Sequence, residues 1–126
     1  MTNKVLIVDD SKLARMGAAK TLRALHADWQ IIEAANSDEA HARVKDSAPD
    51  YLLVDFNMPG TDGIVLAGEV RDVAPRINVA VISANHQIEV INRAHAAGAA
   101  FLPKPLTEKT LREFLDASLL QQNATP

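Results

Sequence analysis

The sequence predicts an α/β fold, in which a doubly wound, five-stranded parallel sheet is flanked by five helices. Two observations support this prediction. Five short apolar runs rich in β-branched residues alternate with segments that have helical periodicity or a helix-forming composition. The runs also contain few polar residues, so each strand has to be covered on both faces, and a parallel sheet between two helical layers provides that cover.

The strand-like runs occupy residues 5–8, 29–32, 51–54, 79–82 and 99–102. Between the first two runs, apolar and small residues recur at the i, i+3, i+4 spacing of one helix face. Ser11 or Asp10 can cap this first helix, because a side-chain oxygen there can accept a hydrogen bond from a free backbone N–H group. The residues of its predicted face are Leu13, Ala14, Gly17, Ala18, Leu22 and Leu25.

Capping and breaking residues delimit the other four helices. Ser37 can cap a second helix, which ends before Pro49, and Gly63 starts a third, which ends before Pro75. A fourth helix around residues 88–97 ends at Gly98, and Thr107 can cap a fifth. The predicted apolar face of the fifth helix consists of Leu111, Phe114, Leu115 and Leu119.

Length and composition indicate one globular domain. A chain of 126 residues can bury roughly two thirds of its unfolded surface around a single core, and a hydrophobic content of 48% is enough to form one. We assign the domain to residues 1–121. Residues 122–126 are assigned to a tail, because this segment continues no apolar helix face.

Composition also excludes several classes of function. The chain has no cysteine, which rules out disulfides, thiolate catalysis and zinc sites built on cysteine. The net charge is -3 and the basic residues are scattered, so direct binding to nucleic acid is not expected. No apolar run approaches the roughly 18 residues of a membrane helix, and the start lacks a signal-peptide pattern. We therefore expect a cytoplasmic protein without membrane contact.

Polar residues follow four of the five predicted strands. Asp9 and Asp10 follow the first strand, Asp55 the third, Ser83 the fourth and Lys104 the fifth. Taken singly, each has a structural explanation as a helix cap, a turn residue or a solvated charge. However, the carboxyl ends of parallel strands meet at one edge of the sheet, where doubly wound folds bind their ligands. The coincidence of these residues at that edge predicts a functional site.

The chemistry of this site follows from its charges. Two unit charges about 4 Å apart interact by about 4 kcal/mol at an effective dielectric near 20, so three crowded carboxylates need a cation. Mg²⁺ prefers oxygen ligands and keeps several waters, and Lys104 supplies a second positive charge. A carboxylate in such a site can attack phosphorus in line. We therefore predict phosphoryl transfer with Asp55 as the nucleophile.

Over residues 4–120 the sequence resembles the receiver domain of two-component response regulators. The resemblance rests on four motifs, which together are specific. They are Val8-Asp9-Asp10-Ser11; Asp55-Phe56-Asn57-Met58-Pro59 with Gly63; Ser83-Ala84; and Phe101-Leu102-Pro103-Lys104-Pro105. The resemblance implies a flavodoxin-like sheet with the strand order 2-1-3-4-5.

The resemblance also implies roles for the acidic residues. Asp55 would be the phosphorylation site. Asp10, Asp55 and the backbone carbonyl of Asn57 would coordinate Mg²⁺, and Asp9 would act mainly through a metal-bound water. The protein would then be a phosphoacceptor switch, whose only chemistry is its own phosphorylation and dephosphorylation.

The same resemblance implies how the switch works. Ser83 and Lys104 would receive the phosphoryl oxygens, and Ser83 would move inward to do so. Phe101 would turn into the space that this movement leaves, although packing at the edge of the core explains Phe101 equally well. The face formed by the fourth helix, fifth strand and fifth helix would change shape. The resemblance further predicts a cis peptide bond between Lys104 and Pro105.

The expected partners are a sensor histidine kinase or phosphotransfer protein and a downstream protein target, with the chain itself a monomer or weak dimer. An alternative is a Mg²⁺-dependent phosphatase with an aspartyl nucleophile. Such enzymes carry Asp-x-Asp after the first strand, whereas Asp9 and Asp10 are adjacent here. A flavodoxin-like nucleotide-binding module is a third possibility, but it needs a phosphate-binding loop at the place where this acidic pair would repel phosphate.

Overall fold

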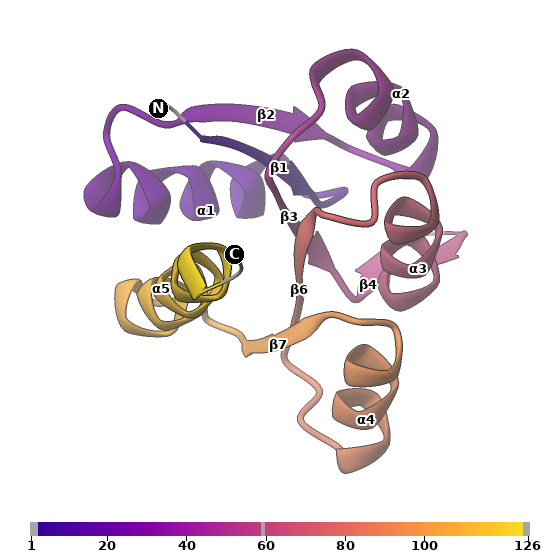
Figure 1. Cartoon of the computed structure of the whole chain (residues 1–126). Coiled ribbons are helices and arrows are strands. Elements are labelled where there is room, and N and C mark those ends of the chain that lie inside the picture. Colours follow the sequence, from indigo (N-terminus) through magenta and orange to yellow (C-terminus); the bar gives the residue numbers. More distant parts are fainter. Residues whose placement is uncertain (1–2, 59, 125–126) are drawn as a thin grey trace.

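The computed structural model describes residues 3–58 and 60–124, with the side chains of 3–58, 60 and 62–117. Five parallel strands form one sheet in the order β2-β1-β3-β6-β7 (Figure 1). Counted within this sheet alone, the order is 2-1-3-4-5, so the predicted fold class is confirmed. The strands are β1 (Lys4–Val8), β2 (Gln30–Ala34), β3 (Tyr51–Asp55), β6 (Asn78–Ser83) and β7 (Ala100–Pro103).

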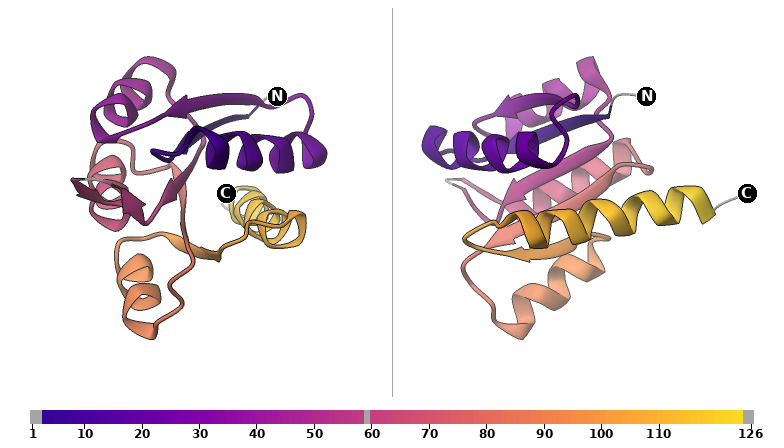
Figure 2. Two further views of the ribbon diagram at one scale, coloured as in Figure 1. Left: turned by 180° about the vertical axis from the view of Figure 1, so that it is seen from behind. Right: turned by 90° about the vertical axis from the view of Figure 1, so that its left-hand side faces the viewer.

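Five helices cover the two faces of the sheet (Figures 1 and 2). On one face lie α1 (Lys12–Leu25) and α5 (Glu108–Ala124), which contact each other. On the other face lie α2 (Ser37–Ser47), α3 (Gly63–Val73) and α4 (Ile88–Ala96). The strands are therefore enclosed on both sides, as their apolar sequences predict.

Strand β1, which lies between β2 and β3, illustrates why the sheet is buried. Successive side chains of a strand point to opposite faces. Val5 and Ile7 accordingly pack in the cluster beneath α1 and α5, whereas Leu6 and Val8 pack in the cluster beneath the other three helices. All four side chains are at most 2% exposed. Two hydrophobic clusters, one on each face, thus hold the sheet in place.

Two of the predicted N-terminal capping residues are observed in the structure, and a third prediction is wrong. The hydroxyl groups of Ser11 and Thr107 each accept a hydrogen bond from the backbone N–H three residues later, at 3.2 Å. The prediction that Ser37 caps α2 is wrong, because Ser37 is already the first helical residue. The cap is Asn36, whose side-chain oxygen accepts a hydrogen bond from the N–H of Glu39 at 2.8 Å.

A short antiparallel hairpin follows Asp55 directly. It consists of β4 (Asn57–Met58) and β5 (Thr61–Asp62), with Gly60 at φ +79° between them. Two-residue strands are too short for a period-2 pattern, so the sequence does not predict them. The hairpin leads straight into α3, which begins at the predicted residue, Gly63.

The structure confirms most of the predicted apolar face of the fifth helix. Leu111 and Leu115 are fully buried and Phe114 is 9% exposed, while the side chain of Leu119 lies outside the described residues. The backbone of α5 continues to Ala124, so the helix includes the first residues of the segment assigned to the tail.

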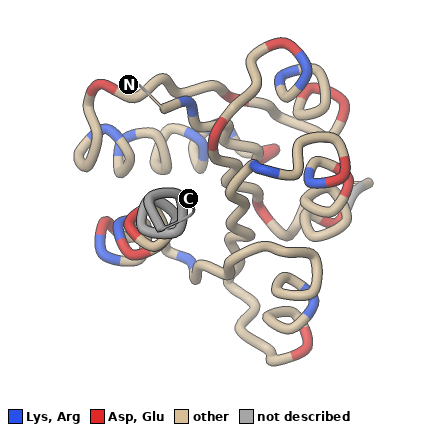
Figure 3. The backbone as a smooth tube through the Cα atoms, viewed as in Figure 1, with Lys and Arg blue, Asp and Glu red and all other residues tan. Residues whose placement is uncertain are grey.

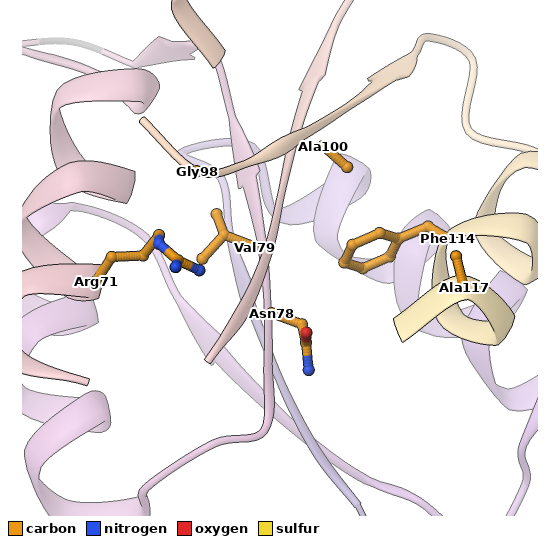
Figure 4. Close-up of a pocket in the computed structure, with 7 residues that line it drawn as sticks. All are labelled: Arg71, Asn78, Val79, Gly98, Ala100, Phe114 and Ala117. Atoms are coloured by element: carbon orange, nitrogen blue, oxygen red, sulfur yellow. The ribbon is translucent and has the colours of Figure 1, made fainter. Parts of the chain in front are cut away.

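A cavity of about 320 Å³ lies at the opposite end of the sheet from the predicted site. Asn78 and Ala100, which line it, are the first residues of their strands, whereas the site residues follow strand ends. Arg71 and Phe114 lie on opposite sides of β6 (Figure 4). The cavity is therefore separate from the predicted site. Its lining residues are Arg71, Asn78, Val79, Gly98, Ala100, Phe114 and Ala117.

Candidate functional site

The parallel sheet brings the three predicted carboxylates together. Asp9 and Asp10 follow β1, and Asp55 is the last residue of the neighbouring strand β3. One carboxylate oxygen from each lies within 4.8 Å of the other two. Asp9 and Asp55 are 8% and 6% exposed, and Asp10 is exposed. The cluster is thus half enclosed and open to solvent on the side of Asp10.

Lys104 supplies the cation nearest to these carboxylates among the described residues. Its Nζ atom lies 2.7 Å from Oδ1 of Asp55 and 4.0 Å from Oδ2 of Asp9. Its backbone N–H donates to the carbonyl of Ser83 at 3.0 Å, which joins the ends of β6 and β7. The peptide bond between Lys104 and Pro105 is cis, as predicted. The lysine therefore reaches the carboxylates from a fixed backbone position.

Burial is the main influence on Asp9. Desolvation raises the pKa of its carboxyl group, and the charges of Asp55 and Asp10 raise it further. The hydrogen bond from the N–H of Ser11, 2.9 Å from Oδ1, and the charge of Lys104 lower the same pKa, but the net shift is upward. Folding therefore makes the ionised form of Asp9 less favourable than it is in the unfolded chain.

Replacing Asp9 with asparagine should raise the free energy of unfolding at pH 7 in the presence of a chelator. Because the pKa of Asp9 is higher in the folded state, stability falls as pH rises through the window between the unfolded and folded values. The gain should therefore shrink as pH is lowered towards about 4. Urea denaturation at both pH values tests this, with the exposed Asp46→Asn as control. A less stable Asp9→Asn protein at pH 7 would contradict it.

The carboxylate cluster suits a hard divalent cation. All its donor atoms are carboxylate oxygens, and their mutual repulsion at such short distances is relieved by bound positive charge. Asn57 lies two residues beyond Asp55, at the start of β4, with an exposed side chain. The donor set fits the predicted metal.

Gly63 allows the loop after Asp55 to fold back closely. Its backbone N–H donates to the carbonyl of Phe56 at 3.0 Å. A Cβ atom at residue 63 would overlap the carbonyl oxygen of Asp55 and approach the carbonyl carbon to 2.9 Å. Only glycine avoids this overlap, so the start of α3 fixes the backbone of the predicted nucleophile.

Ser83 is 1% exposed and ends β6. Its hydroxyl oxygen accepts a hydrogen bond from the N–H of Asn85 at 2.9 Å, and the side-chain oxygen of Asn85 accepts one from the N–H of Gln87 at 3.0 Å. These two bonds stabilise the loop between β6 and α4 in its present form. A movement of the Ser83 hydroxyl towards a new acceptor would break the first of them.

Phe101 lies on β7 and is half-buried against the cluster beneath α2, α3 and α4. Its ring also packs edge to face with that of His86, with the centroids 5.8 Å apart. His86 belongs to the loop that follows Ser83, so the two predicted switch residues are connected through this loop. No sequence pattern predicts this contact, because it depends on how the loop lies against β7.

One functional candidate, Arg15, was not identified from the sequence. Arg15 on α1 donates through Nη1 to the backbone carbonyl of Asp9 at 2.7 Å, and through Nε to the carboxylate of Glu33 at 2.9 Å. Four basic residues and no acidic ones occur on α1, and Figure 3 shows their positions along the helix. One arginine among several gave no reason to select it.

In the described part of the chain, no helix combines the length and apolar character needed to cross a bilayer.

Comparison with known proteins gives consistent matches. A family model for the response regulator receiver domain matches residues 5–116. The chemotaxis protein CheY of Bacillus subtilis is 29% identical over 94% of this chain and 99% of its own length. The transcriptional regulatory protein PdtaR of Mycobacterium tuberculosis is 36% identical over 82% of this chain, but this covers only 50% of that regulator. The chain thus corresponds to nearly all of one relative and to half of the other.

A solved structure extends the similarity to three dimensions. A chemotaxis response regulator of Vibrio cholerae superimposes with a TM-score of 0.81 over 94% of this chain and 99% of that one, at 28% sequence identity. The similarity therefore extends over nearly the whole of both chains.

Proposed function

This chain belongs to the response regulator receiver domain family, and from that premise we propose that Asp55 accepts a phosphoryl group with the assistance of Mg²⁺. Receiver domains of two-component systems act as phosphoacceptor switches. They exchange signals with histidine kinases and downstream targets. In this chain, the observation that carries the proposal is the contact of 2.7 Å between Lys104 and the buried Asp55 beside two further carboxylates.

The transfer step follows from these positions. A carboxylate oxygen of Asp55 attacks the phosphorus of a phosphohistidine, the new O–P bond forms as the N–P bond breaks, and a proton from solvent completes the neutral imidazole. Lys104 exchanges its contact with Asp55 for one with a phosphoryl oxygen. Asp9, Asp10, Asp55 and the backbone carbonyl of Asn57 would hold Mg²⁺, which when bound offsets the charge of the phosphoryl oxygens.

Removing Mg²⁺ should prevent phosphorylation. The isolated protein is expected to gain the mass of one phosphoryl group from acetyl phosphate when Mg²⁺ is present, and to gain none in excess chelator. Without the metal, the negative phosphoryl group would meet three uncompensated carboxylates. Intact-mass spectrometry measures the gain, and readdition of Mg²⁺ is the control. Equal uptake in chelator would disprove the role of the metal.

We assign the output to a switch face made of α4, β7 and α5. Phosphorylation adds roughly -1.5 to -2 charges and three acceptor oxygens. Ser83 then donates to one of these oxygens and releases Asn85, and the loop that carries His86 moves away from Phe101. Phe101 turns inward, which alters the switch face.

The energies suggest that the switch is incomplete without a partner. A hydrogen bond from Ser83 contributes about 1 kcal/mol, and a charged one from Lys104 contributes about 1.5 to 3 kcal/mol at most, because Lys104 gives up its contact with Asp55 to make it. A change from 1:99 to 99:1 needs about 5.5 kcal/mol. Binding of a downstream target to the switched form would supply the difference.

Beryllofluoride, a phosphoryl mimic, should change hydrogen exchange from Ser83 to Leu115 and leave α2 unaffected. The reason is that the loop after Ser83 leads into α4 and contacts β7, whereas α2 has no such link to Ser83 among the described residues. Exchange with and without the mimic, followed by mass spectrometry, tests this. Changes confined to residues before Asp55 would contradict the proposed face.

An experiment can distinguish the proposed phosphoacceptor from the alternative, a Mg²⁺-dependent phosphatase. Adjacent Asp9 and Asp10 do not form the Asp-x-Asp arrangement of such enzymes, so the geometry favours the acceptor role. An aryl phosphate should therefore not be turned over repeatedly. We further propose that the protein acts in the cytoplasm as a monomer or weak dimer, without direct contact to nucleic acid.

A further inference from the structure

Asp9 is held at three points. Its backbone N–H donates to the carbonyl of Ala34 at 3.1 Å, its side-chain Oδ1 accepts from Ser11 at 2.9 Å, and its own carbonyl accepts from Nη1 of Arg15 at 2.7 Å. The first contact fixes the backbone before Asp9, and the second fixes its carboxylate. The third acts on the peptide unit that joins Asp9 to Asp10.

This third contact matters for Asp10, which is exposed and has to stay beside two other carboxylates. A peptide unit is planar, so fixing the direction of the Asp9 carbonyl also fixes the direction of the Asp10 N–H group and limits where Asp10 can point. Repulsion from Asp9 and Asp55 would otherwise turn the Asp10 carboxylate outwards. A donor at the Asp9 carbonyl therefore opposes that rotation.

Arg15 is itself held in place. Its Nε group donates to Glu33 on the edge strand β2 at 2.9 Å, while its side chain is only 14% exposed. Glu33 directly precedes Ala34, the residue that accepts the Asp9 N–H bond. The end of β2 thus supports the Asp9 peptide from both sides, once through its own backbone and once through the guanidinium group.

We propose that Arg15 is a positioning residue for the metal site, which keeps Asp10 directed towards Asp55 by fixing the peptide unit between Asp9 and Asp10. This inference rests on the proposed function. Because the guanidinium group serves two acceptors at once through different nitrogens, geometry and not charge alone is required. Lysine carries its donors on one nitrogen and lacks the planar fork, so it cannot reach the two acceptors at the separate positions of Nε and Nη1.

The test is the affinity for Mg²⁺, measured by isothermal titration calorimetry on the unphosphorylated protein. Arg15→Met and Arg15→Lys should each bind Mg²⁺ about 10-fold more weakly than the wild type, as expected when a group that orients a metal ligand is lost. Arg23→Met is the matched control, because Arg23 is exposed near the far end of the same helix and should leave the affinity unchanged.

A second measurement distinguishes positioning from general damage. The Mg²⁺ concentration for half-maximal phosphorylation by acetyl phosphate should rise about 10-fold in Arg15→Lys, while the rate at saturating Mg²⁺ stays within about twofold of the wild type. Circular dichroism shows whether each variant is folded. If Arg15→Met has lost its fold, the result for Arg15→Lys, which keeps the aliphatic stem and the charge, decides whether Arg15 positions the site.

Two outcomes would overturn the inference. If folded Arg15→Lys binds Mg²⁺ as tightly as the wild type, the contact to Asp9 does not position the site, although the proposed function stands. If the wild type itself binds no Mg²⁺, the proposed function fails and the inference fails with it.

Discussion

Replacing Asp55 with asparagine should abolish the uptake of a phosphoryl group from acetyl phosphate in the presence of Mg²⁺. Asparagine keeps the size of the side chain but removes the nucleophilic carboxylate. Asp9 and Asp10 cannot substitute for it, because Lys104 contacts Asp55 at 2.7 Å and lies 4.0 Å from Asp9. Intact-mass spectrometry should therefore find no gain of one phosphoryl group, where the wild type gains one.

The matched control is Asp46→Asn, which alters an exposed carboxylate on α2 and should be phosphorylated like the wild type. We expect Asp55→Asn to fold, because Lys104 still has the carboxylate of Asp9 nearby. Thermal unfolding checks this. If the Asp55→Asn protein were phosphorylated, Asp55 would not be the acceptor. Peptide mapping would then identify the residue that carries the phosphoryl group.

Replacing Gly63 with alanine should lower the free energy of unfolding by about 1 to 3 kcal/mol, the usual range for a side chain forced into occupied space. The added methyl group would overlap the carbonyl of Asp55, which is part of β3 and cannot move without disturbing the sheet. Phosphorylation should also slow, because the shift displaces Asp55. Urea denaturation measures the first effect and mass spectrometry the second.

Gly17 offers the opposite result for the same substitution. It lies within α1, and apart from the adjacent residues and the backbone of the helix itself, no atom lies within 4 Å of the position that a Cβ would take. Alanine at residue 17 should therefore stabilise the protein by about 0.5 to 1 kcal/mol through its helix propensity. Equal effects at the two glycines would show that the close contact to Asp55 does not limit residue 63.

The sequence predicted those parts of the site that depend on strand ends alone. Asp9, Asp10, Asp55 and Lys104 could be placed together because parallel strands end at one edge of the sheet, which needs no knowledge of loop geometry. The distances among them confirm that their side chains meet. Their roles in phosphorylation and metal binding remain predictions.

Other parts depended on details that periodicity does not encode. Arg15 and Glu33 meet only because of the place at which α1 crosses the end of β2, which no local pattern specifies. The cap of α2 was placed one residue too late because Asn36 and Ser37 are both good capping residues, and side-chain geometry selected the first. The hairpin after Asp55 was too short to be seen in a pattern of alternating residues.

The strand order allows the sheet to assemble in the order in which its strands are synthesised. As the chain leaves the ribosome, β2 and β3 can pair on either side of β1, then β6 joins the free edge of β3, and β7 joins β6. No strand has to insert between two that are already paired. Lys104 follows the last strand, so its amine is the final component to arrive. A nascent chain that ends before β7 carries all three carboxylates without this amine, so the ion pair to Asp55 forms only after the fifth strand of the sheet has been made.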